Sequence, residues 1–372
     1  MKQRKIITLT SGLGNQMFQY ALFLFLKQNG SKCRVYPFNK YLNQHNGLEL
    51  ERLFSTKVSI SKTNILIDKY VNLYFKLSPY LSKLAQILHF KDSRILFKLL
   101  PYDVVVFPGW KDYTFIPLLS EKIQSVFKFP EITDSQNLKI ITEINNTTSV
   151  SIHIRRGDFQ SNAKWRCTLG DICDRQYYQN AIDHILTKYP TCTFFIFSDD
   201  ITWAKKNLSL SNARFIDWNH GENSYKDLYL MSLCKHNILS NSTFSLWGAW
   251  LNKNSEKTVI VPLKWHNEHN DTTYRMYTDP KWIFIDNRKP NVSLILDEVC
   301  SPTDLKRILN QRYSDFEIIT DTVFPDINDD RIKTMSNPTG NFIIHISNPE
   351  IKSFKNRNYL KSRLLECFEQ TF

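Results

Sequence analysis

The stretch SVSIHIRRGD, residues 149–158, decides the fold. Its first six residues alternate as in a β-strand, which puts His153 and Arg155 on one face and Ile154 on the other, inward face. Two arginines, a glycine and an aspartate follow at the point where the strand would leave its sheet. A buried strand that ends in a polar turn is typical of a parallel sheet, where ligands lie at the carboxyl ends of the strands.

Strands and helices alternate on both sides of this stretch, which predicts an α/β fold with parallel sheets. Residues 265–290 read as a tail that crosses back over the domains, and Pro290 begins a further strand–helix–strand unit. We expect domains at 1–148, 149–289 and 290–372. The predicted strands are 6–10, 33–37, 104–108, 149–154, 192–197, 214–216, 237–240, 258–261, 292–296, 316–320 and 342–346, with 258–261 the last before Pro262. The predicted helices are 16–28, 177–189, 204–208, 225–234, 241–251, 303–311 and 359–368.

Composition narrows the class of partner. The 372 residues include 48 Lys and Arg against 36 Asp and Glu, a basic balance that favours anionic partners. No run of five basic residues, zinc-finger spacing or RNA-binding signature is present, which disfavours nucleic acid. Seven cysteines without C-x-x-C spacing suit a reducing compartment and give a zinc site no support. The apolar run 6–10 is too short for a signal or a membrane span, so we expect a cytoplasmic protein.

Residues 60–107 interleave Lys and Arg with Leu, Ile, Phe and Tyr at periods of three and four, which predicts amphipathic helices over 65–77 and 81–100. Such helices could simply pack on the domain core. They could also present a basic, aromatic face to an anionic membrane or a lipid-linked acceptor.

Two segments place charged groups at predicted strand ends. Arg155 and Arg156 would repel each other unless anions hold them, and bidentate binding of phosphate suits arginine; a structural salt-bridge cluster is the alternative. Asp158 could orient an arginine or act as a base. The pair Asp199 and Asp200 could bind a metal, a ribose or a base edge, or cap a helix over 201–208; with no third carboxylate beside them, magnesium is disfavoured.

Two turns could hold phosphate through backbone N–H groups. The turn at 11–16 places glycines between a strand and a helix, although it matches neither nucleotide-binding glycine signature and could be a plain tight turn. The segment 240–245 gathers hydroxyl groups at a helix start, as a neutral phosphate cradle or as ordinary N-capping. Together these segments predict an anion site without a metal cage, into which a nucleoside-diphosphate sugar would fit.

Four blocks in order make the chain resemble the α1,2-fucosyltransferases of glycosyltransferase family 11. They are GLGNQMFQYA at 12–21, HIRRGDF at 153–159, FSDD at 197–200, and the pair LMS at 230–232 and SNSTFSLWGAW at 240–250. The resemblance covers about residues 5–285. It implies a GT-B-like fold of two Rossmann-type domains with a cleft between them, and an inverting, metal-independent transfer of L-fucose from GDP-β-L-fucose. The predicted acceptor is the 2-OH of a terminal β-galactoside in an O-antigen, capsule or H-type glycan.

The same resemblance implies roles for individual residues. Arg155 should hold the β-phosphate with support from Arg156, while His153 and one of Asp199 and Asp200, with Asp200 favoured, should contact the guanine. Asp158 is the candidate general base. The remaining donor-binding residues implied are Asn241, Ser242 and Thr243 at the phosphates, and Gly12, Gly14, Asn15 and Gln16 in a loop that faces the cleft.

Residues 290–372 lie outside the match. Segments 292–296 and 309–319 resemble the start of a family 2 glycosyltransferase, but Thr320, Asp321 and Thr322 stand where an aspartate-rich donor site is usual. We interpret this part as a truncated module. Alternative functions are another GDP-sugar transferase or a fucosyltransferase of different linkage, a sugar- or nucleotide-binding protein without turnover, and a membrane-associated scaffold in polysaccharide assembly.

Overall fold

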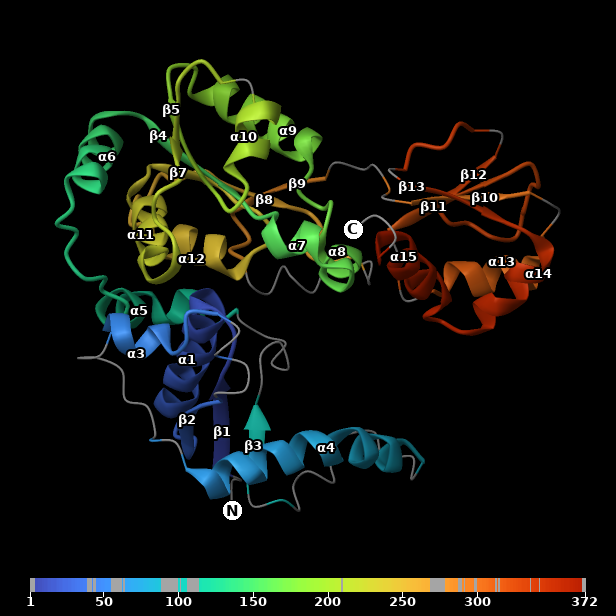
Figure 1. Ribbon diagram of the computed structural model, residues 1–372, viewed down its shortest axis with the longest axis horizontal. Coiled ribbons are helices and arrows are strands. Elements are labelled where there is room, and N and C mark those ends of the chain that lie inside the picture. The colour runs from blue at the N-terminus through green and yellow to red at the C-terminus, as the bar shows by residue number, and fades with distance from the viewer. Residues whose placement is uncertain are drawn as a thin grey trace.

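The computed structural model describes residues 4–38, 42, 45–54, 62, 64–87, 100, 102–105, 114–208, 210–267, 278–286, 290, 292–297, 300–311, 313, 315–334, 336–340 and 342–369. Helices surround three separate parallel sheets (Figure 1). The predicted α/β class is therefore confirmed. Two Rossmann-type units are followed by a small third unit, as expected of a GT-B-like chain.

The N-terminal sheet has the order β2-β1-β3, with β1 (Arg4–Leu9) between β2 (Cys33–Pro37) and β3 (Tyr102–Val105). Helix α1 (Leu13–Gln28) follows β1, and α3 (Glu49–Phe54) and α4 (Ile65–Ile87) lie between β2 and β3 in the chain. Helix α4 is continuous where two helices were predicted, because Pro79 does not interrupt it. The rest of the second predicted helix, 88–99, and residues 106–108 of the predicted strand lie outside the described residues.

The second sheet has the order β6-β5-β4-β7-β8-β9. Its strands are β4 (Ser149–Ile154), β5 (Thr193–Ser198), β6 (Ala213–Ile216), β7 (His236–Ile238), β8 (Val259–Pro262) and β9 (Ile283–Ile285). The segment 265–290 was predicted as a tail without a strand, and this was wrong. The segment 265–290 carries β9, which pairs in parallel with β8 as an edge strand.

The helices between β3 and β8 in the chain are α5 (Ser120–Val126), α6 (Ser135–Asn146), α7 (Gly157–Ser161), α8 (Ala163–Leu169), α9 (Arg175–Lys188), α10 (Ile201–Asn207), α11 (Tyr225–Leu233) and α12 (Thr243–Leu251), with short 3-10 turns at Pro117–Leu119 and Gly221–Asn223. Helix α5 lies beside α1 and α3 (Figure 1). One apolar core joins the first two sheets. The Trp247 ring of α12 lies 4.7 Å from Phe18 of α1 and 5.2 Å from Phe127, between ring centroids. Helix α6 precedes the expected boundary at 148 but packs against α11 of the second unit.

The C-terminal sheet has the order β12-β11-β10-β13. It consists of β10 (Val292–Leu296), β11 (Phe316–Thr320), β12 (Ile332–Thr334) and β13 (Phe342–Ile346), with α13 (Pro302–Leu309), α14 (Asn348–Ile351), a 3-10 turn at Lys352–Lys355 and α15 (Tyr359–Glu369). Helix α15 packs against α8, and Lys264 forms an ion pair with Asp315. This unit is thus attached to the second unit, and its likeness to a family 2 enzyme stays a prediction.

Candidate active site

The predicted site residues lie at a reversal in strand order. Numbered along the chain, the second sheet runs 3-2-1-4-5-6, so β4 and β7 are neighbours and the chain winds outward from them in opposite directions. Ligands of such sheets bind outside the carboxyl ends of the strands at this switch point. Arg155 follows β4, and Asn241 and Ser242 come shortly after β7. The sheet topology therefore gathers segments that are about 85 residues apart in the sequence.

Arg155 lies between two carboxylates. One terminal nitrogen is 2.6 Å from Asp158 Oδ1, and the other is 2.7 Å from Asp199 Oδ2. The guanidinium also lies over the Phe159 ring at 5.5 Å. A guanidinium has five N–H donors, so these two contacts leave donors for a further acceptor. The structure brings together Arg155, Asp158 and Asp199, as the sequence predicted.

Arg156 is held from three sides. Its backbone N–H donates to Asp199 Oδ1 at 2.7 Å, and its Nε lies 3.3 Å from Asp200 Oδ2. The guanidinium stacks 4.3 Å from the centre of the Trp203 ring. Asp200 also caps α10, since its Oδ1 accepts the backbone N–H of Trp203. The structural readings of these aspartates, ion pairing and N-capping, are both confirmed, and a contact to guanine remains a prediction.

Gly157 allows Asp199 to come this close to the Arg155–Arg156 backbone. A Cβ at position 157 would lie 2.7 Å from Asp199 Oδ2, well inside van der Waals contact. Any side chain here would push Asp199 away from both arginines. The glycine of the HIRRGD block therefore has a steric role in the cluster.

His153 points towards the neighbouring strand. Its Nδ1 is 2.8 Å from Ser240 Oγ, and its ring centroid is 5.6 Å from that of Phe244 at the start of α12. Burial lowers the pKa of His153 to about 4, while Asp199 nearby opposes that shift and Arg155 adds to it. The imidazole is therefore neutral at neutral pH. It links the end of β4 to the hydroxyl cluster that follows β7.

The N-termini of two helices from different units meet at Gly14. A Cβ on Gly14 would lie 2.7 Å from the backbone nitrogen of Phe244, so only glycine lets α1 approach α12 this closely. Ser242 caps α12, its Oγ accepting the Phe244 N–H at 3.3 Å, and Thr243 is the first helical residue. A helix N-terminus carries a partial positive charge, so two of them side by side favour an anion.

Asn15 lies in the first turn of α1 and is half-buried. Its Oδ1 is inaccessible to solvent and has no hydrogen-bond partner among the residues that the structure describes. A buried acceptor left without a donor costs about 1–3 kcal/mol. A sugar hydroxyl is a donor that would satisfy it.

Gln16 is fully buried and ties the glycine turn to the loop before α3. Its Nε2 donates to the carbonyl oxygens of Ser11 and Gly47, at 2.8 and 2.9 Å, and its Oε1 accepts the Leu50 N–H at 3.0 Å. All these partners are backbone groups. The described contacts of Gln16 therefore shape the turn, and a ligand contact stays a prediction.

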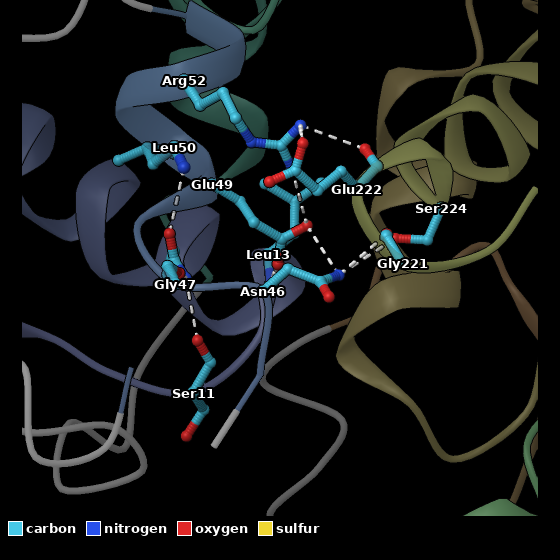
Figure 2. Close-up of polar contacts among 11 residues, drawn as sticks. Ser11, Leu13, Asn46, Gly47, Glu49, Leu50, Arg52, Gly221, Glu222 and Ser224 are labelled. Atoms are coloured by element: carbon cyan, nitrogen blue, oxygen red, sulfur yellow. Dashed lines mark hydrogen bonds and ion pairs between the residues drawn. The ribbon is translucent and has the colours of Figure 1, made fainter. Parts of the chain in front are cut away.

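Glu49 extends this network towards the second unit. It accepts the N–H of Leu13 at 3.0 Å, and Asn46, which lies 3.4 Å from its other oxygen, donates to the carbonyl of Gly221 at 2.9 Å. Arg52 donates to the carbonyl of Glu222 at 3.1 Å. Burial raises the pKa of Glu49, although Asn46 and Arg52 oppose the shift. Figure 2 shows how these side chains bridge α3 and the 221–224 turn.

Asn241 binds two backbone carbonyl groups through its side-chain amide. Its Nδ2 donates to the carbonyl oxygens of Leu169, at the end of α8, and Trp265, at 2.9 and 3.2 Å. It therefore holds the segment after β8 against α8. From the sequence SNSTFS alone, this backbone anchor cannot be distinguished from a ligand contact.

His45 is the main residue that the sequence did not single out. A Cβ on Gly12 would lie 3.7 Å from its Nδ1, which places the ring beside the glycine turn. Partial burial and then the charge of Arg155 lower the pKa of His45, while Asp158 raises it. The N-terminal unit thus places an imidazole near enough to Arg155 and Asp158 for their charges to act on its pKa. The sequence signal for this loop is weak: it is a histidine followed by the turn-forming residues Asn46 and Gly47.

The chain is similar to several known proteins. A solved structure, NodZ α-1,6-fucosyltransferase soaked with GDP-fucose, aligns over 68% of this chain and 93% of its own, with 12% identity and a TM-score of 0.36. An O-antigen biosynthesis glycosyltransferase, WbnK of Escherichia coli, is 31% identical over 72% of this chain and 97% of its own length. The α-1,2-colitosyltransferase of Escherichia coli is 30% identical over 76% of this chain and 98% of its own. Residues 110–286 match the model of glycosyl transferase family 11, and with these relatives the match shows that the chain belongs to that family.

Proposed function

We propose that this glycosyltransferase moves L-fucose from GDP-β-L-fucose to the 2-OH of a terminal β-galactoside, with inversion at the anomeric carbon. One observation carries the proposal: the N-termini of α1 and α12 meet at Gly14, next to the switch point where Arg155 and Arg156 lie. Two helix N-termini and two guanidinium groups suit the pyrophosphate of a nucleotide sugar. Asn15 Oδ1, which has no donor among the described residues, suits a hydroxyl of the transferred sugar.

The reaction itself needs charge stabilisation and a proton acceptor. The acceptor oxygen attacks C1 of fucose, the bond from C1 to the β-phosphate oxygen breaks, and GDP leaves with an added negative charge. Arg155 would stabilise that charge with donors already fixed by Asp158 and Asp199, so little reorganisation is needed in the transition state. These groups would let the reaction proceed without a metal ion.

Two residues are candidates for the base that takes the acceptor proton. Asp158 fits by position, but its Oδ1 already accepts a 2.6 Å contact from Arg155. His45 lies beside the glycine turn, and its lowered pKa keeps the ring neutral and able to accept a proton at neutral pH. We assign the base to Asp158 or His45 and separate them by experiment below.

The donor has a close alternative. Colitose is the 3-deoxy analogue of L-fucose, and a relative with 30% identity is named as an α-1,2-colitosyltransferase. GDP-colitose, or another GDP-sugar, is therefore the second candidate donor, and a different linkage the second candidate product. For the acceptor, we propose a galactose-terminated oligosaccharide or lipid-linked O-antigen or capsule repeat at the cytoplasmic face of the inner membrane.

The deciding experiment measures GDP release from GDP-fucose in the presence of EDTA, with lactose, N-acetyllactosamine and galactosyl-β1,3-N-acetylhexosamine as acceptors. Acceptor-dependent release, with product linkage read by NMR, is the expected result. Faster GDP release from GDP-colitose or GDP-mannose than from GDP-fucose would assign that sugar as the donor instead. Release only after Mg²⁺ or Mn²⁺ is added would overturn the metal-independent mechanism, and failure to bind GDP would overturn the proposal.

A further inference from the structure

Helix α4 is fixed to the N-terminal sheet by its inner face. Val71 and Tyr74 are buried against the sheet, and Tyr74 donates to Asp103 Oδ1 at 2.9 Å. Tyr70 donates to the carbonyl of Tyr102, and Asp68 accepts from Tyr36 at 3.0 Å. The helix lies along the outer edge of this unit, away from the active site (Figure 1). Its orientation, and hence the identity of its outer face, is thus determined.

The outer face of α4 carries a long row of exposed apolar side chains. Leu66 and Tyr80 are 75% and 73% exposed, and Ile87 is 62% exposed. Spacings of seven, four and three residues place all members on one side of the helix. Single exposed apolar residues are ordinary, but a contiguous row over six turns of helix marks a contact surface. The row consists of Leu66, Leu73, Leu77, Tyr80, Leu84 and Ile87.

Lysines run beside this row at seven-residue intervals. Lys69, Lys76 and Lys83 are all exposed, and the heptad spacing keeps them on one flank of the apolar side chains. The sole acidic residue in the sequence of α4 is Asp68, and its side chain bonds Tyr36 on the inner side. The outer face is therefore apolar and cationic, with no carboxylate of α4 available to pair with the lysines.

We propose that the outer face of α4 lies in the interface of an anionic membrane. The apolar row would enter the boundary between headgroups and acyl chains, and the three lysines would lie at the lipid phosphates. Charge decides between this occupant and a second copy of the chain. Two copies joined through this face would bring lysine rows together with no acidic partner on α4, whereas an anionic lipid surface complements them. No described helix is long and apolar enough to cross a membrane.

This inference rests on the proposed function only in that a lipid-linked acceptor gives membrane binding a purpose. Membrane binding itself does not require the donor sugar. It is tested by sedimentation of the full chain with phosphatidylcholine vesicles, with and without phosphatidylglycerol. The wild type should bind the anionic vesicles, and added salt should release it. The triple variant Lys69→Gln, Lys76→Gln, Lys83→Gln should lose binding roughly a hundredfold, because each lysine near an anionic surface contributes about a factor of five. The triple variant Leu73→Ser, Leu77→Ser, Tyr80→Ser should lose it as well.

The matched control is Lys122→Gln, Lys139→Gln, Lys253→Gln, which removes the same charge from exposed sites elsewhere. This control should bind as the wild type does. Equal loss in the control would mean that net charge alone attracts the vesicles, and would overturn the proposal. The proposal would also be overturned if the wild-type protein did not bind the anionic vesicles, or if it dimerised through the apolar row instead. Both α4 variants should keep wild-type turnover on soluble lactose, which separates failure here from failure of the proposed reaction.

Discussion

The indole Nε1 of Trp247 donates a 2.9 Å hydrogen bond to the carbonyl oxygen of Gly14, across 233 residues of sequence. Trp247 is fully buried, and its ring also packs on Phe18 of α1. The bond and the ring contact fix the N-terminus of α1 against that of α12. Because both helix ends are held by protein contacts alone, their partial charges are in place before any anion binds, which is the arrangement that electrostatic catalysis requires.

Gly14→Ala should separate these helices. The new methyl group would lie 2.7 Å from backbone atoms of Thr243 and Phe244, and backbone cannot yield as a flexible side chain does. Overpacking of this kind costs about 1–3 kcal/mol. We expect a lower melting temperature and weaker GDP binding, measured by thermal unfolding and calorimetry. Gly12→Ala is the matched control, because its methyl group would meet His45 at an ordinary 3.7 Å; equal effects of both variants would contradict the close approach at Gly14.

Arg155→Ala should lower turnover roughly a hundredfold or more, the usual effect of removing one preorganised donor. Arg155→Lys keeps the charge but cannot bond Asp158 and Asp199 in the same forked geometry, so it should recover only part of the rate. Arg214→Ala removes a comparable 2.6 Å contact to Glu143 at the surface and should leave turnover unchanged. Near wild-type turnover of Arg155→Ala, in folded protein, would remove Arg155 from the mechanism.

Asp227 should make stability depend on pH. Burial raises its pKa to about 7, against an opposing hydrogen bond from Asn219 at 2.7 Å. Between pH 4 and 7 the folded chain therefore keeps a proton that the unfolded chain has lost, so stability is greatest below this window and falls as pH rises through it. Asp227→Asn does not titrate and should flatten the melting temperature between pH 5 and 8. Asp183→Asn, on the exposed side of α9, should leave the wild-type slope; an unchanged slope in Asp227→Asn would show that another group causes it.

The sequence predicted the buried strands most accurately, because short β-branched runs between turns admit few other structures. The bounds of β2, β4, β10, β11 and β13 agree residue for residue with prediction. Prediction failed where the local pattern was weak. Edge strand β9 is three partly buried residues inside a polar tail, and α5 to α8 were not assigned because their apolar residues are few and their contacts are distant.

At the candidate site, the sequence indicated which residues after buried strands lie close together, while their roles stay predictions. Arg155, Asp158 and Asp199 come together because parallel strands end at one edge of the sheet. The prediction was weaker for Gln16 and Asn241. Their described side-chain hydrogen bonds go to backbone groups. The prediction missed His45, since the sequence alone does not show that a loop after β2 lies beside the glycine turn after β1, where the charge of Arg155 from another unit acts on it. Contacts between units depend on how the two sheets are placed.

His45→Gln provides the test of the catalytic base. Partial burial, and then the charge of Arg155, lower the pKa of His45 from its usual 6.5, so its base form should persist into mildly acidic solution. If His45 accepts the proton, kcat/KM of the wild type should fall on the acid side with an apparent pKa below 6.5. His45→Gln should then lose about 10²–10⁴-fold in rate and also lose this acid limb, while GDP binding stays intact. Asp158→Asn is the comparison. If it abolishes the limb and His45→Gln retains it, the base is Asp158, and His45 serves only to position the acceptor beside Gly12.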